Sequence, residues 1–228
     1  MSDVLSLLTT PAADRMPATL TERTRKLYDR MSRVYGFSTL LFHSDAHRAA
    51  IESSGLRDGM RVLEVATGSG EMLRRLARAN GSGVTIGVDL SPKMAAIAQR
   101  RARRGCPAAR SACHAVDARS LPFPSTSFDA LFCCYLLELL SYEDIRRTLA
   151  EFHRVLRFRG TLTLVMIGEN TAAFNRVYRV LGRAAPAFWG RQVEKCVPEL
   201  VTAANFHIVT DRSVRQAGYP SRVVSAHK

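Results

Sequence analysis

Short apolar runs alternate with amphipathic segments through the middle of the chain, and each pattern indicates one kind of element. The runs 62–65 and 84–88 are almost uninterrupted and rich in valine and isoleucine, as in strands buried on both faces of a parallel sheet. A segment with helical periodicity follows each run. Strand–helix alternation between residues 61 and 167 therefore predicts a parallel sheet with right-handed crossovers.

The remaining elements show the same signals: apolar runs bounded by turn residues for strands, and amphipathic spacing for helices. We expect strands over 113–118, 127–135, 161–167, 207–210 and 221–226, a helix and turn over 151–160, and a helix over 198–204. With the first two runs, this gives seven strands.

Three segments lie outside this alternation. Residues 1–19 contain two prolines among small polar residues and are expected to form a flexible arm. Residues 20–54 predict a lid of two amphipathic helices, and residues 171–190 predict a helical insert after the fifth strand. At 228 residues the chain has the length of one α/β domain, which we place at 20–228.

The turn after the first apolar run has small residues at alternate positions. Glu64 and Ala66 begin this spacing, and Gly68 and Gly70 continue it. Glycines let the backbone approach a ligand closely, and the following helix N-terminus offers free N–H groups. The third glycine of a dinucleotide fingerprint would fall at Leu73, and no Gly-Lys-Ser/Thr of a phosphate loop follows. The acidic residue at the start of the spacing, Glu64, instead favours a ligand with a positive charge or an amino group.

Two further acids stand at the ends of the next strands. Asp89 lies about 20 residues beyond the glycine turn, where a carboxylate accepts hydrogen bonds from both hydroxyls of a ribose. Ser91 and Pro92 then suit the N-cap and the first position of a helix. Asp117 ends the third strand. Asp129, by contrast, is expected to cap or pair locally rather than to contact a ligand.

The spacing of the glycine turn resembles the first motif of the class I S-adenosylmethionine (SAM) dependent methyltransferases. The later strands and acids resemble that family's following motifs, in order, between residues 62 and 167. The resemblance implies a Rossmann-like α/β fold with a mostly parallel seven-stranded sheet and flanking helices, SAM as the cofactor, and an aspartate at 117 that lies toward the adenine amino group. The predicted cofactor-binding residues are Glu64, Ala66, Gly68, Gly70, Asp89, Leu90, Met94, Asp117, Ala118 and Cys134.

The charge is unusual for an otherwise ordinary globular composition. Thirty-three basic residues against 20 acidic ones give a net charge of +13, and all but four of the basic residues are arginine. Clusters over 74–78, 100–104 and 154–159 fall on predicted helix faces. They either attract an anionic surface or simply solvate helices that flank a sheet, and both explanations stay open. Of the functional options we favour a membrane leaflet over nucleic acid, since no basic patch interleaved with aromatic residues is visible.

The five cysteines form neither a C-x-x-C pair nor an even disulfide framework. Cys133 and Cys134 are adjacent in a predicted strand, so their side chains should point to opposite faces. We interpret the cysteines as reduced thiols and expect no metal site. No apolar run predicts a membrane-spanning helix, and the first residues lack the leading positive charge of a signal peptide. We expect a cytoplasmic protein, with peripheral attachment to the inner membrane surface as the option that the charge raises.

The methyl acceptor is expected to be lipid-like or amphipathic. Residues 27–35 resemble the opening of two related families, the ubiquinone/menaquinone-biosynthesis C-methyltransferases and the bacterial phosphatidylethanolamine N-methyltransferases. Ala66, in place of the usual glycine, resembles the quinone-biosynthesis family. That family, however, has an arginine–asparagine pair where this chain has residues 135–139, and a Lys-Pro-Gly-Gly turn where this chain has residues 157–160. The charge and the missing pair favour a phospholipid amine. The alternatives are C-methylation of a quinol or other small molecule, a SAM-binding module without catalysis, and a nicotinamide oxidoreductase, which Leu73 disfavours.

Direct methyl transfer from SAM needs mainly positioning and exclusion of water, because the cofactor is already an activated electrophile. An amine or quinol acceptor must also lose a proton. The predicted catalytic residues are Tyr28, Tyr135 and His43, with His47 and Glu138 as further candidates. Tyr135 is the best placed, immediately beyond the fourth strand at the edge where open α/β sheets bind ligands.

Overall fold

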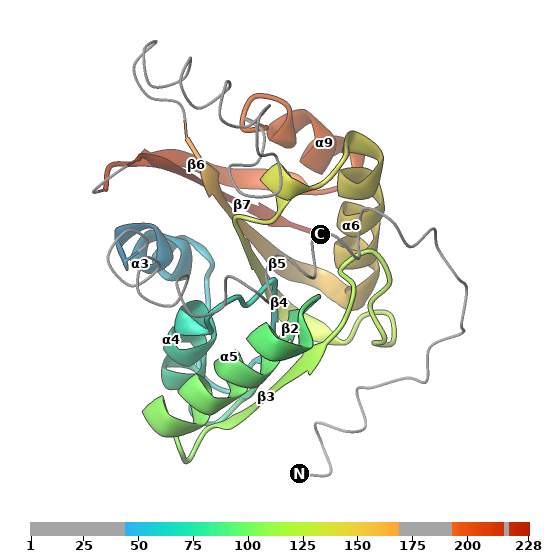
Figure 1. Ribbon diagram of the computed structural model, residues 1–228. Helices are drawn as coiled ribbons and strands as arrows, with labels where there is room; N and C mark the ends of the chain where they lie inside the picture. The colour runs from blue at the N-terminus through green and yellow to red at the C-terminus, as the bar shows by residue number, and fades with distance from the viewer. Residues whose placement is uncertain (1–43, 169–192, 217–218) are drawn as a thin grey trace.

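A computed structural model describes residues 44–168, 193–216 and 219–228 of the chain. Seven strands form one sheet in the order β3-β2-β1-β4-β5-β7-β6 (Figure 1). They are β1 (Arg61–Val65), β2 (Val84–Asp89), β3 (Arg110–Ala115), β4 (Phe128–Cys134), β5 (Leu156–Ile167), β6 (His207–Val214) and β7 (Ser221–His227). The first five strands are parallel, and β7 is antiparallel to both β5 and β6. The expected seven-stranded, mostly parallel, Rossmann-like sheet is confirmed.

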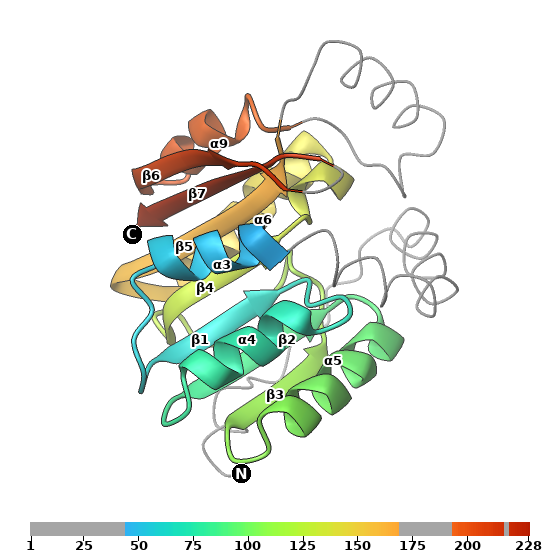
Figure 2. The same cartoon turned by 90° about the vertical axis from the view of Figure 1, so that its left-hand side faces the viewer.

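Helices cover both faces of the sheet. They are α3 (Ser44–Ser53), α4 (Glu71–Ala79), α5 (Pro92–Gly105), α6 (Tyr142–Val155) and α9 (Val197–Ala203), with a 3-10 turn η1 (Leu137–Leu139) after β4. Figures 1 and 2 show α3, α4 and α5 on one face and α6 and α9 on the other. Strand order reverses between β1 and β4, and in open α/β sheets ligands bind outside the carboxyl ends of the strands at such a point.

The alternation of side chains along each buried strand supplies a core on both faces. Leu63 packs in the cluster beneath α6 and α9, whereas its neighbour Val62 packs in the cluster beneath α3 and α4. Cys133 and Cys134 divide in the same way, which confirms that their side chains point to opposite faces. All five cysteines are free.

Local capping rules set the start of α5 as the sequence predicts. Ser91 is the N-cap, and its side-chain oxygen accepts a 3.1 Å hydrogen bond from the backbone N–H of Met94. Pro92 occupies the first helical position, where a missing N–H has no cost. These two residues place Asp89 directly before a helix N-terminus.

The bounds of β3, β5 and β6 differ from the sequence-based expectation, and β6 extends to Val214 rather than ending at residue 210. β3 ends at Ala115, so Asp117 lies two residues beyond the strand rather than at its last position. β5 begins at Leu156, because that residue pairs with Phe128 before a register shift in the β4–β5 ladder. The expected turn over 157–160 is therefore an irregular part of β5, with Arg159 at a φ of 60°.

Several expectations fall on parts of the chain that the structure does not describe. They are the arm at 1–19, the insert at 171–190, and the lid at 20–54 apart from α3, including Tyr28 and His43. Within the described ranges, no helix is both long and apolar enough to cross a membrane.

Candidate functional site

The chain leaves β1 through a turn in which three small residues adopt left-handed backbone conformations. Ala66, Gly68 and Gly70 have φ values of 63°, 50° and 79°. At Gly70 a side chain is excluded twice over, because the positive φ is unfavourable and a Cβ would overlap the backbone of Ala98 in α5. The turn therefore lies directly against α5, as the close helix packing of a ligand-binding turn requires.

Asp89 holds this turn in place. Its Oδ2 accepts a 2.8 Å hydrogen bond from the N–H of Gly68, and its Oδ1 accepts one of 2.9 Å from the N–H of Ser91. The N–H of Ala66 donates to the carbonyl of Val88 at 2.8 Å. One carboxylate thus joins the glycine turn, the end of β2 and the start of α5 into a single unit.

Glu64 lies behind the turn as a buried carboxyl group with 1% of its surface exposed. Its Oε2 is buried and has no hydrogen-bond partner among the described residues. Burial raises the pKa of Glu64 well above its ordinary value, and the charges of Asp89 and Glu71 raise it further. A buried carboxyl group without a cation is costly, so this position suits a ligand that brings a positive group.

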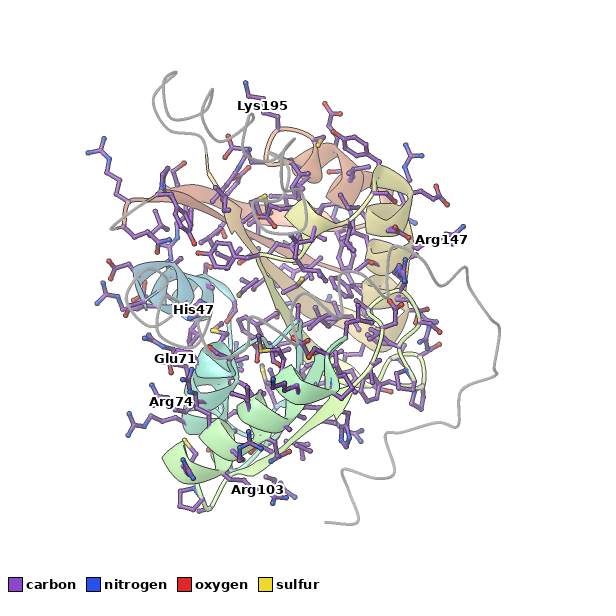
Figure 3. The ribbon with its side chains drawn as sticks, viewed as in Figure 1. His47, Glu71, Arg74, Arg103, Arg147 and Lys195 are labelled. Carbon is purple, nitrogen blue, oxygen red and sulfur yellow. The ribbon has the colours of Figure 1, made fainter. Side chains whose placement is uncertain are left out.

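The acid at the start of α4 is already neutralised. Glu71 accepts hydrogen bonds from Arg74 at 2.7 Å and from Arg75 at 3.0 Å. Figure 3 labels Glu71 and Arg74 at α4. Burial raises the pKa of Glu71, but the two guanidinium groups outweigh it and the net pKa is lowered. Glu64 is therefore the carboxyl group of this turn that has no partner cation among the described residues.

Asp117 lies near the same edge of the sheet but is already paired. The N–H of Val116 donates to the carbonyl of Asp89 at 2.9 Å, which brings the two strand ends together. Arg119 donates to Asp117 Oδ2 at 2.7 Å and to Asp144 at 3.1 Å. Sequence reasoning missed Arg119, whose second partner, Asp144, lies 25 residues further along the chain.

The other predicted cofactor residues surround this edge at different depths. Met94 is buried in the first turn of α5, and Leu90 is half-buried just before it. Ala118 packs partly buried against the cluster beneath α6 and α9. Cys134 is the last residue of β4 and packs against the opposite cluster. The predicted set is thus brought to the carboxyl edge of β1, β2, β3 and β4.

Tyr135 follows β4 in a left-handed conformation, with a φ of 55°. Its hydroxyl lies 2.7 Å from Ser221 Oγ and accepts a 3.3 Å hydrogen bond from Gln216 Nε2. Burial, and then the neighbouring Tyr219, raise the pKa of Tyr135 well above its ordinary value. Its phenol is therefore protonated near neutral pH and suits positioning better than proton abstraction.

Asp129 and His47 were not predicted to bind the cofactor, and the structure places both. Asp129 accepts a 2.7 Å hydrogen bond from the N–H of Arg61 on β1 and forms an ion pair with Arg157 on β5. It is paired within the protein, but with neighbouring strands rather than locally in the sequence as expected. His47, a further catalytic candidate, is buried in α3 with 3% exposure.

This sheet order, with a glycine turn after β1 and acids around the carboxyl edge, defines an α/β protein of the nucleotide-cofactor-binding class. A family model described as a methyltransferase domain matches residues 62–160. The demethylmenaquinone methyltransferase of Thermus thermophilus is 30% identical over 164 residues, which cover 72% of this chain and 71% of the relative. The chain belongs to the class I SAM-dependent methyltransferases, and SAM is the cofactor of that family.

A second relative and a solved structure complete the comparison. The demethylmenaquinone methyltransferase of Tropheryma whipplei (strain Twist) is 34% identical over 165 residues, 69% of this chain and 66% of the relative. The chain thus spans slightly under two thirds of that protein. The crystal structure of the [4+2]-cyclase SpnF superposes with a TM-score of 0.74 at 22% identity, over 94% of this chain and 99% of that one. At this identity the likeness shows the fold alone, and the neighbour's name shows that the fold does not decide the reaction.

Proposed function

We propose that this chain binds SAM at the carboxyl edge of β1 and β2 and transfers its methyl group to a quinol-type acceptor. The proposal that the chain binds SAM rests on Glu64 Oε2, which is buried and has no hydrogen-bond partner among the described residues. Such a carboxyl group suits the ammonium group of SAM. Asp89 would accept hydrogen bonds from the ribose hydroxyls, and Asp117 one from the adenine amino group. Gly68 and Gly70 would keep the backbone close to the ligand.

The acceptor is proposed from the relatives. Both are named demethylmenaquinone methyltransferases, and they favour the quinol alternative over the phospholipid amine that we expected from the charge. Positive charge does not separate the two acceptors, because a quinol with a long apolar chain also resides in a membrane. C-methylation of a quinol is therefore our first choice.

Peripheral membrane association is part of this proposal. Many arginines are occupied in ion pairs, such as Arg147 with Glu143. Arg100, Arg103 and Arg104 of α5 have no ion pair with the described residues. These three, which we call the α5 arginines, would attract an anionic leaflet that holds the acceptor.

Two measurements test the function. Calorimetry should detect binding of SAM but not of NADH; the reverse result would revive the nicotinamide oxidoreductase. Mass spectrometry should then detect labelled methyl transfer to reduced demethylmenaquinone but not to phosphatidylethanolamine vesicles. A protein that binds SAM yet methylates neither acceptor, nor any component of a lipid extract, would be a non-catalytic module.

A further inference from the structure

A second buried carboxyl group lies at the carboxyl end of β4, outside the glycine turn. Glu138 belongs to η1 and has 3% of its surface exposed. Its Oε1 accepts a 2.7 Å hydrogen bond from the N–H of Ile167, the last residue of β5. Its Oε2 is buried and has no hydrogen-bond partner among the described residues. One oxygen is therefore anchored to the sheet, and the other is buried without a hydrogen bond to the described residues.

Among the described residues, no basic side chain forms an ion pair with Glu138. The ionisable groups that sense its charge are the thiols of Cys133 and Cys134, and burial holds the pKa of both well above the ordinary value, so both stay neutral. Burial likewise raises the pKa of Glu138 from 4.5 to about 7, against the lowering effects of the backbone N–H groups of Ile167 and of Glu138 itself.

Glu138 also lies close to the cofactor side of the edge. Glu64 lies on β1 and is paired in register with Phe132 of β4, the strand that leads into η1 and Glu138. The two carboxyl groups therefore belong to neighbouring strands and lie toward the same edge of the sheet. Methyl transfer needs the donor and the acceptor side by side, and a carboxyl group at the end of the adjacent strand is consistent with that requirement.

A purely structural role accounts poorly for this residue. Glutamine would also accept a hydrogen bond from the Ile167 N–H without bringing an ionisable group into the core. A buried carboxyl group with an unsatisfied oxygen destabilises the fold, and such groups are concentrated at functional sites.

We propose that Glu138 is the catalytic base, which takes the hydroxyl proton of the acceptor on its Oε2. The assignment rests on the proposed methyl transfer to a quinol. As the proton passes to Glu138, the ring carbon bonds to the methyl carbon, and the sulfur–methyl bond breaks with its electron pair left on sulfur. The ring C–H proton then leaves while the oxygen is protonated again. One net proton is released, and no oxidant is needed.

The test compares Glu138→Gln with Glu143→Gln, which removes an exposed carboxylate at the start of α6. Methyl transfer to reduced demethylmenaquinone in detergent micelles should fall at least about 100-fold in kcat for Glu138→Gln, a usual loss for a general base. The acidic limb of the pH–rate profile should vanish, while SAM affinity by calorimetry stays at the wild-type value. Glu143→Gln should match wild type in all three measurements.

Infrared spectroscopy gives a readout that does not depend on activity. The wild-type protein and Glu143→Gln should show a buried carboxyl band that titrates at about 7. Glu138→Gln should lack that transition, while the buried carboxyl group of Glu64 remains in all three proteins. A fully active Glu138→Gln, or one that keeps the acidic limb, overturns the base assignment while leaving the proposed function intact. If the wild type methylates only another acceptor, the quinol proposal fails and the same comparison on that acceptor decides the base. A wild type that binds SAM and methylates nothing overturns both.

Discussion

The backbone N–H of Gly68 donates a 2.8 Å hydrogen bond to Asp89 Oδ2, so the acid at the end of β2 shapes the turn that follows β1. The other oxygen of Asp89 accepts from the N–H of Ser91 at 2.9 Å. A carboxylate offers about four acceptor positions, so one group can bind backbone N–H groups and also accept hydrogen bonds from ribose hydroxyls. Asp89 therefore combines a structural role in the turn with its proposed role in cofactor binding.

Replacing Asp89 tests the cofactor site. Asp89→Ala should weaken SAM binding at least about 100-fold, because two hydrogen bonds to a charged acceptor are lost, each of which contributes roughly 1.5–3 kcal/mol. The control is Asp58→Ala, which removes an exposed carboxylate that binds Ser82 at the opposite edge of the sheet. Calorimetric titration with SAM should give wild-type affinity for the control. Equal affinities for the two variants would remove Asp89 from the site.

Gly70 tests the packing of the turn on α5. Gly70→Ala should lower the free energy of unfolding by about 2–4 kcal/mol, because it adds a Cβ at positive φ and forces overlap with Ala98. Gly81→Ala is the matched control, since a Cβ there meets nothing within 4 Å. Urea denaturation should place the control within about 0.5 kcal/mol of wild type. Similar losses for both would contradict the close approach of turn and helix.

Features that depend on short-range rules could be predicted from the sequence. The opposite faces of Cys133 and Cys134 follow from the period of a strand, and the N-cap at Ser91 follows from residue type and position. The order of apolar runs and acids likewise predicted the parallel part of the sheet and the edge at which Glu64 and Asp89 meet. Each of these inferences needed only neighbours in the sequence or a known crossover rule.

Features that depend on contacts between distant segments could not be predicted. Leu73 excluded a dinucleotide motif in the sequence. In the structure its side chain packs against Gly87 of β2, where an added Cβ would lie 3.0 Å from Leu73 Cδ2. Arg119 joins Asp117 to Asp144 on α6, and no local pattern announces that bridge. The early start of β5 similarly depends on pairing with Phe128 across the sheet.

The stability of the fold should depend on pH through Glu138. Its folded pKa of about 7 exceeds the ordinary 4.5, so between these values the unfolded chain releases a proton that the folded chain keeps. The free energy of unfolding should therefore fall as pH rises through this window, by about 3 kcal/mol at 1.36 kcal/mol per pKa unit, and change no further above it.

Glu138→Gln isolates this effect, because Glu64 and every other acid remain in both proteins. Urea denaturation across the window should show the stability of wild type falling relative to the variant as pH rises. The control Glu143→Gln should follow the wild-type curve, since that side chain is 63% exposed. A constant difference between wild type and Glu138→Gln at all pH values would contradict the raised pKa.

The α5 arginines should govern attachment to anionic membranes. Figure 3 shows Arg103 on the outer side of α5. Changing all three to glutamine should weaken binding to vesicles that contain phosphatidylserine by about 100-fold, since each basic residue near such a surface contributes about 1 kcal/mol. Binding of the wild type should decrease steeply with added salt and be absent for neutral vesicles.

A single-site comparison separates this patch from net charge. Arg103→Gln and Arg147→Gln each remove one positive charge, but Arg147 lies on the opposite face of the sheet and is paired with Glu143 at 3.2 Å. Vesicle sedimentation should show about fivefold weaker binding for Arg103→Gln and a smaller change for Arg147→Gln. Equal effects would mean that net charge alone drives association. If the wild type fails to bind anionic vesicles, the arginines serve only to solvate the helices.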